Sequence, residues 1–424
     1  MTQTVHPALS DATGGRVMGR AHAWLRGRTL QRLRDIQGGE ILLRDGAGEI
    51  RLGRPVHGLP AATVQVHDPA FWPALAFGGS VGAGESYARG HWSCDDLTGL
   101  CRILLRSTAD LDAMESGLAR LSAPARAIAH RLRRNSRAGS RRNIAAHYDV
   151  GNDFFAAFLD QTMMYSCAIF EHPRMTLAEA QIAKLARICR KLELGPGDHV
   201  LEIGTGWGGF AIHAARHHGC RVTTTTISPA QHRLAVERVR AAGLSDRIEV
   251  LQADYRDLRG RYDKLVSIEM IEAVGHDHFD AYFRQCAGLL ADHGMMLLQA
   301  ITIDDRRYEY ARDSVDFIKR HIFPGACLPS VSVIAASLAR CTDLRVFHLE
   351  DIGPHYATTL RHWRERLGAR RGDVLGMGYA QALLRAWEFY LCYCEAGFLE
   401  RSTGDVQMLL VKPGNRRAPL PAGP

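Results

Sequence analysis

The chain has 424 residues and a net charge of +8, with 46% hydrophobic and 23% charged residues. This composition is that of a globular protein of two or three domains, and it excludes a disordered chain or a small disulfide scaffold. The ten cysteines form no CxxC pair, and no run of about 18 uncharged apolar residues occurs, so we expect reduced thiols, no metal site and no transmembrane segment.

The N-terminal part shows no basic segment followed by an apolar run, so we expect no secretory signal. Short strand-like pieces at 40–44, 49–52 and 63–67 alternate with glycine turns and apolar helical stretches. No constellation of catalytic side chains is visible there. We therefore predict an α+β accessory domain over residues 1–118.

Residues 119–142 form a strongly basic linker without any acidic residue. Its arginines are Arg120, Arg126, Arg131, Arg133, Arg134, Arg137, Arg141 and Arg142. Three interpretations are open: a solvated linker, a surface for anionic lipid head groups, or a nucleic-acid contact. The absence of interleaved aromatic residues disfavours the last one. We predict that residues 1–142 dock on a membrane and that the protein binds no nucleic acid.

Strands and helices alternate in the next domain, which we place at 143–412. Thr176 and Glu179 predict a capping box for a helix that ends near Leu194. The alternation indicates a parallel sheet that is covered by helices on both faces. The predicted strands are 199–203, 221–227, 247–252, 262–269 and 294–301, and the predicted helices are 209–217, 229–242 and 278–291.

The alternation stops after Ile301. Residues 302–342 form an insertion whose apolar side chains Phe317, Ile318, Ile322 and Phe323 favour a helical lid over an acyl chain, although a cap without substrate contact is also open. A strand at 344–349, helices at 357–368 and 374–400, and a strand at 406–411 follow. We expect this last strand to be an antiparallel edge partner and residues 413–424 to be disordered.

A glycine-rich turn follows the first strand of this domain, in the run LEIGTGWGG at 201–209. Such turns let the backbone approach a ligand closely. Glu202 would repel a pyrophosphate, and the acidic residue of dinucleotide sites about twenty residues further on is missing. S-adenosylmethionine carries an ammonium and a sulfonium group and no phosphate, so it fits this turn better than a dinucleotide.

Several ordered motifs resemble the cyclopropane-fatty-acyl-phospholipid and mycolic acid cyclopropane synthases, a family of S-adenosylmethionine-dependent methyltransferases. The likeness extends from His147 to Lys412 and more weakly over the first 110 residues. It implies a Rossmann-like class I methyltransferase fold of class α/β, with a seven-stranded, mostly parallel sheet. The motifs are HYDVGNDFF at 147–155, MMYSCAIF at 163–170, LEIGTGWGG at 201–209, TTISPAQ at 225–231, IFPGACLPS at 322–330, HYATTLRHW at 355–363 and FYLCYCEAGF at 389–398.

The resemblance implies methyl transfer to a cis double bond of a phospholipid acyl chain, followed by loss of a proton that closes a cyclopropane ring. The family's proton acceptor is a bound bicarbonate. Its holders here would be Cys167, Glu272, Gln299, the backbone of Ile301, and Tyr356. Cys394 matches a cysteine of the family that is often labelled as the active-site residue. This chemistry needs no thiolate, so a packing or substrate-channel role is favoured.

Two residues depart from the family pattern. Gln299 stands where a histidine is usual, and a glutamine offers a neutral amide donor that cannot titrate. Ala273 also replaces a histidine. Ring closure is therefore the step that these departures affect, and a methyltransferase that yields a methylene- or methyl-branched chain is the alternative.

The resemblance also implies the cofactor contacts, which lie at the ends of the first three strands and in the motif before them. Gln231 is placed for the ribose hydroxyls, and Tyr255 with Arg256 for the adenine. For Thr226 and Ile227, a place in the sheet core is the alternative. The full set is Tyr165, Ser166, Val200, Leu201, Glu202, Ile203, Gly204, Thr205, Gly206, Trp207, Gly208, Thr226, Ile227, Ser228, Gln231, Tyr255 and Arg256.

The sequence thus predicts a cytoplasmic enzyme that modifies unsaturated phospholipids and associates peripherally with the inner face of the membrane. It leaves open whether the protein is a monomer or a homodimer. Two other classes remain as alternatives: a lipid-binding protein without activity, against which the intact cofactor motifs argue, and a methyltransferase of soluble small molecules.

Overall fold

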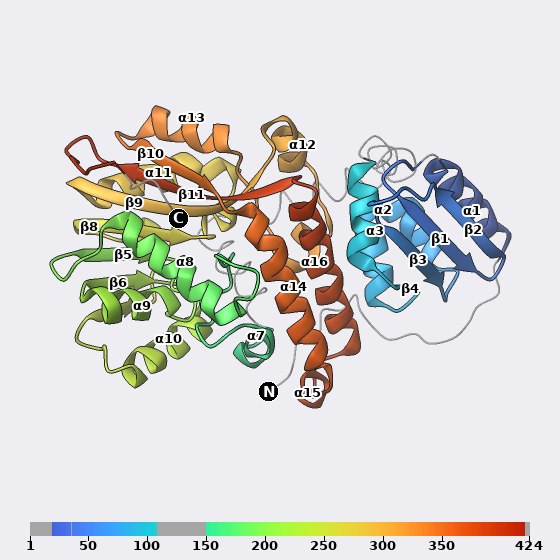
Figure 1. Cartoon of the computed structure of the whole chain (residues 1–424), viewed down its shortest axis with the longest axis horizontal. Helices are drawn as coiled ribbons and strands as arrows, with labels where there is room; N and C mark the ends of the chain where they lie inside the picture. Colours follow the sequence, from blue (N-terminus) through green and yellow to red (C-terminus); the bar gives the residue numbers. More distant parts are fainter. Residues whose placement is uncertain (1–18, 35, 108–149, 420–424) are drawn as a thin grey trace. The chain divides into compact units, whose positions relative to one another are not determined.

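The computed structural model describes residues 19–34, 36–107 and 150–419 (Figure 1). The predicted basic linker lies outside these residues. The described chain divides into two compact units. The first contains residues 19–34, 36–107, 314–322 and 360–402, and the second contains residues 150–313, 323–359 and 403–419.

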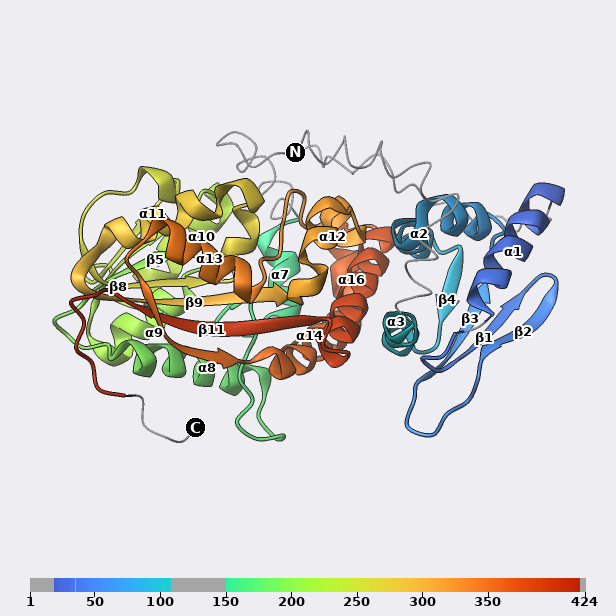
Figure 2. The same cartoon turned by 90° about the horizontal axis from the view of Figure 1, so that it is seen from above.

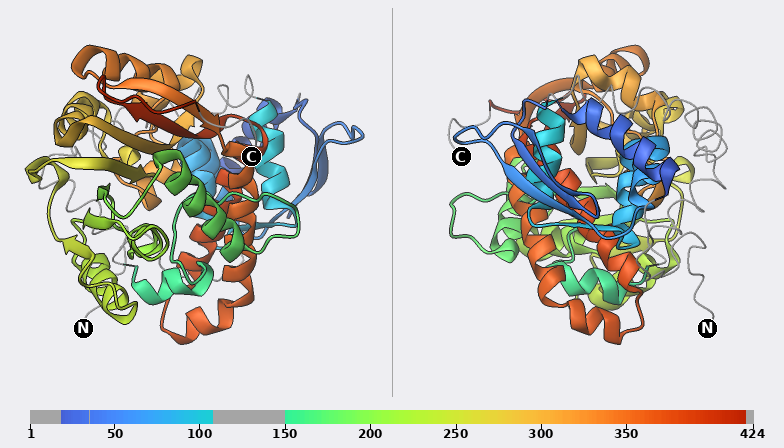
Figure 3. Two further views of the ribbon diagram at one scale, coloured as in Figure 1. Left: turned by 60° about the vertical axis from the view of Figure 1, so that its left-hand side comes forward. Right: turned by 90° about the vertical axis from the view of Figure 1, so that its right-hand side faces the viewer.

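The first unit has a four-stranded sheet in the order β2-β1-β3-β4, drawn in blue in Figure 3. β1 and β2 form an antiparallel hairpin, β3 runs parallel to β1, and β4 is antiparallel to β3. The strands are β1 (Glu40–Asp45), β2 (Gly48–Gly53), β3 (Ala61–Val66) and β4 (Trp92–Cys94), and the helices are α1 (Arg20–Leu33), α2 (Phe71–Ala88), α3 (Leu97–Arg106), α15 (Arg371–Gly376), α16 (Gln381–Leu399) and a π-helical turn Ile318–Ile322.

Helix α16 belongs to this first unit although it is far from the N-terminal sheet in the sequence. Arg102 and Arg106 of α3 each donate to the Glu400 carboxylate at 2.6 Å, and Thr98 donates to Glu395 at 3.1 Å. A Cβ on Gly84 of α2 would lie 2.4 Å from the Phe317 ring, so this glycine permits close packing. The domain limits predicted from the sequence place residues 374–400 in the methyltransferase domain. These limits remain a prediction.

The second unit is built on a seven-stranded sheet in the order β10-β11-β9-β8-β5-β6-β7. All strands except β11 run in the same direction, because only the pairs that contain β11 are antiparallel. The predicted mostly parallel α/β sheet is confirmed. The strands are β5 (His199–Ile203), β6 (Arg221–Thr225), β7 (Ile248–Leu251), β8 (Tyr262–Ile268), β9 (Leu290–Ile303), β10 (Arg345–Asp351) and β11 (Thr403–Val411).

Helices cover both faces of this sheet. Figure 2 shows α11 and α13 on one side and α8 and α9 on the other. Alternate residues of one strand enter different cores: Leu201 belongs to the core that contains Tyr282 of α11, and Val200 belongs to the core that contains Phe210 of α9. The helices of the unit are α7 (Asn152–Phe158), α8 (Leu177–Leu192), α9 (Gly209–His218), α10 (Pro229–Ala241), α11 (Phe279–Leu289), α12 (Tyr308–Asp313) and α13 (Val331–Cys341), and α14 (Gly353–Ala369) begins in it and ends in the first unit.

Several local predictions are confirmed and others need correction. The capping box at Thr176 and Glu179 is present at the start of α8. The single helix predicted at 374–400 is wrong: α15 and α16 are separate, and Gly378 between them has a φ of +92°. The last strand is antiparallel as predicted, but it lies between β9 and β10 rather than at the edge.

The chain after β11 also differs from the expected disorder, at least up to residue 419. Asn415 donates to the His293 carbonyl at 2.7 Å. The Arg417 guanidinium lies 5.1 Å from the centre of the Phe347 ring and pairs with Glu193 at 2.9 Å. These contacts hold this part of the tail against the second unit. Among the described helices, none is both long and apolar enough to cross a bilayer.

Candidate functional site

The glycine-rich turn joins β5 to α9. Gly204, Gly206 and Gly208 have φ angles of +106°, +53° and +84°, which residues other than glycine rarely adopt. The backbone N–H groups of Gly204 and Thr205 both donate to the Thr225 carbonyl, at 3.1 and 3.0 Å. The turn therefore holds the ends of β5 and β6 together, where ligands of parallel α/β sheets bind.

Glu202 lies buried at the end of β5, directly before this turn. Its Oε2 accepts a hydrogen bond from the Thr224 hydroxyl at 2.6 Å, and Thr224 also contacts Thr205 at 2.7 Å. Burial raises the pKa of Glu202 to about 8. A cationic ligand next to Glu202 would favour its ionised form and would compensate its burial. These residues therefore fit the ammonium and sulfonium groups of S-adenosylmethionine.

Residues that follow β6 and β7 lie near the same edge of the sheet. The Thr226 hydroxyl donates to Gln231 Oε1 at 2.9 Å, and the Ser228 hydroxyl caps α10 by accepting from the Gln231 N–H at 3.3 Å. After β7, the Arg256 guanidinium pairs with Asp254 at 2.6 Å and lies 5.6 Å from the Tyr255 ring centre. Ile227 is only partly buried, so it is not part of the sheet core.

Aromatic side chains surround the segment before the sheet. Tyr165 stacks on Phe323 with ring centres 6.3 Å apart and contacts Phe155 at 5.4 Å. The Trp207 indole N–H of the glycine turn donates to Asn152 at 2.8 Å. Ser166 accepts from the buried Lys184 ammonium at 2.7 Å, and burial lowers the pKa of Lys184 to about 8.

The residues of the predicted lid fall into both units. Phe323 belongs to the second unit, where it contacts Tyr165. Phe317, Ile318 and Ile322 belong to the first, where the Phe317 ring packs against Phe389 at 4.9 Å.

Glu269, directly after β8, lies at the centre of a buried polar cluster. Its Oε1 accepts from the Cys167 backbone N–H at 2.7 Å and from the Gln299 amide at 2.8 Å. Its Oε2 accepts from the Tyr356 hydroxyl at 2.5 Å. Three of the five predicted anion holders thus converge on one carboxylate that the sequence analysis did not single out.

The other two predicted holders contact each other. Glu272 Oε1 accepts from the Ile301 backbone N–H at 2.6 Å, while its Oε2 has no hydrogen-bond partner among the described residues. Burial, and next the charge of Glu269, raise the pKa of Glu272 to about 8. Glu272 is therefore mostly protonated at neutral pH.

A relay of polar side chains fixes the orientation of Gln299. Its Nε2 also donates to Asp405 at 3.3 Å, and its Oε1 accepts from Gln407 at 3.1 Å. Gln407 in turn accepts from the Lys191 ammonium at 2.8 Å. Burial and the Glu269 charge raise the pKa of Asp405 well above its usual range, which favours its protonated form.

The two predicted cysteines occupy different places. Burial raises the pKa of the Cys167 thiol well above its ordinary value, so it is present as a thiol beside the cluster. Cys394 lies in α16 of the first unit, and burial and the Asp316 charge raise the pKa of its thiol as well. Neither site lowers a thiol pKa, which a nucleophilic cysteine would need.

Four residues of the candidate site were not predicted from the sequence: Glu269, Asp405, Gln407 and Lys184. Glu269 had a usable signal, because it is a second carboxylate at the end of the strand that precedes Glu272. The signal for Asp405 and Gln407 was weaker, because it depends on how β11 pairs with β9. This register places Asp405 opposite Ile301 and Gln407 opposite Gln299. No sequence signal marked Lys184, which lies within the amphipathic helix α8.

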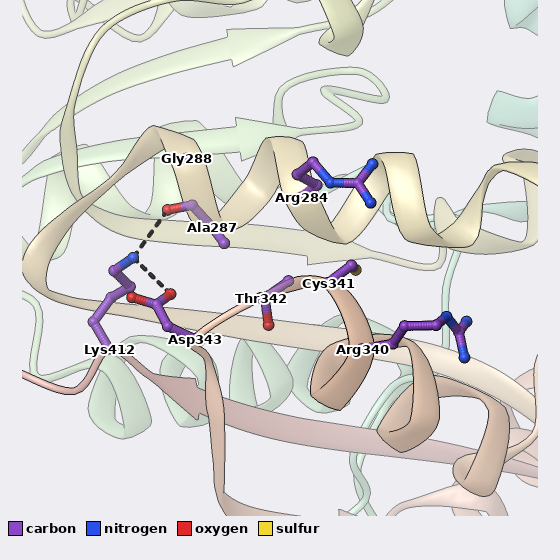
Figure 4. A pocket seen from close by; sticks show the side chains of 8 residues that line it. All are labelled: Arg284, Ala287, Gly288, Arg340, Cys341, Thr342, Asp343 and Lys412. Atoms are coloured by element: carbon purple, nitrogen blue, oxygen red, sulfur yellow. Dashed lines mark hydrogen bonds and ion pairs between the residues drawn. The ribbon is translucent and has the colours of Figure 1, made fainter.

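A second cluster and a surface hollow lie elsewhere in the second unit. Cys189, His213 and His218 hold their ligand atoms within 4.8 Å of one another, but burial raises the pKa of the Cys189 thiol to about 12, which opposes metal binding. A hollow of about 550 Å³ lies where α11 and α13 end, near Lys412 (Figure 4). It is close to the start of β9, whereas the candidate site lies at the opposite end of that strand.

Comparisons with known proteins agree with this geometry. The model of the family "mycolic acid cyclopropane synthetase" matches residues 135–408. The chain is 40% identical over 362 residues to a tuberculostearic acid methyltransferase of Mycobacterium tuberculosis, covering 84% of each chain. It is 36% identical over 360 residues to the cyclopropane-fatty-acyl-phospholipid synthase of Escherichia coli K12, covering 84% of this chain and 89% of that one.

Solved structures show the same relationship. A mycolic acid cyclopropane synthase in complex with SAH and CTAB superposes with a TM-score of 0.60 at 32% identity, over 64% of this chain and 98% of that one. The cyclopropane synthase MmaA2 from Mycobacterium tuberculosis gives a TM-score of 0.61 at 30% identity, with the same coverage. The chain therefore belongs to the mycolic acid cyclopropane synthetase family of S-adenosylmethionine-dependent methyltransferases.

Proposed function

We propose that the chain transfers the methyl group of S-adenosylmethionine to the cis double bond of an unsaturated phospholipid acyl chain and closes a cyclopropane ring. The observation that carries this proposal is the position of the Glu269 cluster. It follows β8, next to β5 with its glycine turn and Glu202, so a proton acceptor lies at the sheet edge that suits a sulfonium ligand.

When bound, S-adenosylmethionine supplies an electrophilic methyl group. The chain's own residues have three further tasks. Glu202 binds the cationic cofactor. The aromatic rings of Tyr165, Phe323 and Phe155 exclude water and favour positive charge on the substrate. The cluster around Gln299 and Tyr356 provides the proton acceptor, which in the family pattern is a bound bicarbonate.

A second candidate product is a methylene- or methyl-branched acyl chain. Gln299 favours it, because a neutral amide replaces the histidine that the family pattern has among the holders of the base. The resemblance to a tuberculostearic acid methyltransferase also supports a fatty-acyl methyl transfer as the core of the reaction. Both products need the same cofactor site and the same class of substrate.

Lipid analysis of a host that expresses this chain distinguishes the two products. We expect cyclopropane acyl chains from the wild type, and a larger cyclopropane fraction from Gln299→His if the amide weakens ring closure. Losing one charge-assisted hydrogen bond costs about 1.5–3 kcal/mol, or roughly one to two orders of magnitude in that step. A wild type that yields only branched chains would establish the second candidate instead.

We also propose that the protein acts as a peripheral membrane protein at the inner, cytoplasmic face of the membrane. The acid-free run of eight arginines in residues 119–142 supports this, since basic residues near an anionic surface contribute about 1 kcal/mol each. A homodimer remains a prediction that analytical ultracentrifugation would test.

Co-sedimentation with liposomes tests the membrane contact. We expect binding to anionic vesicles that falls steeply with added salt, because salt screens exposed charges beyond about 8–10 Å at physiological ionic strength. Replacing Arg133, Arg134, Arg137 and Arg141 by glutamine should weaken it further. Equal binding to neutral and anionic vesicles at every salt concentration would contradict the proposal.

A further inference from the structure

Glu269 adopts an unusual backbone conformation directly at the sheet edge. Its φ of +48° lies in the left-handed region, which is strained for a non-glycine residue. The Glu269 N–H donates to the Gln299 carbonyl at 2.8 Å, so the hydrogen bonding of β8 to β9 holds this conformation in place. Strain of this kind is retained where the surrounding structure requires it.

The contacts of the Glu269 carboxylate are those that a bound anion would make. The Cys167 N–H, the Gln299 amide and the Tyr356 hydroxyl all donate to it within 2.8 Å. A carboxylate and a bicarbonate are both planar anions with oxygen acceptors, so one set of donors suits either. Because Glu269 already occupies these donors, a separate anion could not use them at the same time.

The groups around Glu269 are buried polar side chains and one buried cation. The neighbouring Asp405 is fully buried, which raises its pKa, and the Gln299 amide carries no charge. Lys184 lies nearby and its charge acts on Glu269, Asp405 and Cys167. Glu269 itself is only partly buried, in contrast to Gln299 and Asp405, which are fully buried.

We infer that the Glu269 carboxylate replaces the bound bicarbonate as the proton acceptor of this enzyme, so that the reaction needs no added anion. This inference rests on the proposed function. A new carbon–carbon bond forms between the sulfonium methyl and one alkene carbon as the sulfur–carbon bond breaks, and the positive charge moves to the other alkene carbon. A C–H bond of the new methyl then breaks. Its electron pair closes the ring, and its proton goes to Glu269, which becomes a neutral carboxylic acid.

The Glu269→Gly variant tests this inference. Glycine tolerates the left-handed backbone and leaves the three donors without their carboxylate. In bicarbonate-depleted buffer, with cis-unsaturated phosphatidylglycerol vesicles, we expect the variant to form product about 100-fold more slowly or worse, because it lacks its base. Added bicarbonate should restore product formation at least tenfold, whereas the wild type should change less than twofold.

Two further measurements separate this inference from the proposed function. Carbon-13 NMR of labelled bicarbonate should show binding to Glu269→Gly and none to the wild type, whether or not lipid is methylated. Glu193→Gly is the matched control, since Glu193 also has a positive φ, of +53°, but lies exposed at the end of α8. It should behave as the wild type in both assays.

The outcomes are distinct. A wild type that methylates no lipid refutes the proposed function, while the NMR result still decides the role of the Glu269 position. A wild type whose product formation requires bicarbonate, a Glu269→Gly variant that works at full rate without it, or a variant that binds no bicarbonate overturns the inference.

Discussion

Replacing Glu202 by glutamine should weaken the binding of S-adenosylmethionine about 30- to 700-fold. Glu202 is buried, and its carboxylate is hydrogen-bonded to Thr224 at the edge where the glycine turn begins. Removing one partner of a buried charge pair costs roughly 2–4 kcal/mol, which corresponds to that change in the dissociation constant. Isothermal titration calorimetry measures it directly.

The same site predicts how the affinity depends on pH. In the ligand-free protein the pKa of Glu202 is about 8, so a cationic ligand must displace a proton below that pH. The affinity for S-adenosylmethionine should therefore rise by up to about tenfold per pH unit between pH 6 and 8 and then level off. Glu237→Gln, on the exposed face of α10, is the control and should leave both values unchanged. A Glu202→Gln variant that binds with wild-type affinity would contradict the assignment.

Replacing Glu272 by glutamine should make the folded protein more stable above neutral pH. The pKa of Glu272 is raised from 4.5 to about 8, so the folded protein keeps a proton that the unfolded chain releases. A group of this kind contributes stability fully below pH 4.5, and the contribution is lost as the pH rises through 8. The loss amounts to about 1.4 kcal/mol per pH unit within the window, on the order of several kcal/mol in total.

Glutamine resembles the protonated glutamate and does not titrate, and its Oε1 keeps the acceptor for the Ile301 N–H. The free energy of unfolding from denaturant titrations should therefore decline less between pH 5 and 8 in Glu272→Gln than in the wild type. Glu237→Gln should follow the wild-type curve. Parallel curves for Glu272→Gln and the wild type would show that Glu272 is not buried in a protonated form.

The sheet and the glycine turn at its edge could be predicted from the sequence because their signals are local. Alternating strands and helices fixed the parallel sheet, and the glycines with Glu202 marked the edge where β5 ends. The position of β11 within the sheet could not be predicted from local signals. The sequence shows its apolar character, but its position between β9 and β10 depends on pairing between distant segments.

The polar cluster illustrates the same limit in the candidate site. Cys167, Gln299 and Tyr356 were each chosen from motifs, but the group they contact, Glu269, was not. The position of the Glu269 carboxylate depends on a left-handed backbone conformation, which local residue preferences do not predict. Likewise, α16 with Cys394 clusters with the N-terminal sheet through long-range pairs such as Arg102 with Glu400.

The transfer of a labelled methyl group tests the central claim most directly. Purified protein is incubated with trideuteromethyl S-adenosylmethionine and vesicles of either saturated or cis-unsaturated phosphatidylglycerol, and the acyl chains are analysed by mass spectrometry. We predict label in the unsaturated acyl chains alone, with one of the three deuterons lost when the cyclopropane forms. Label in saturated chains, in the head group, or in no lipid at all would contradict the assignment of this site to methyl transfer at an acyl double bond.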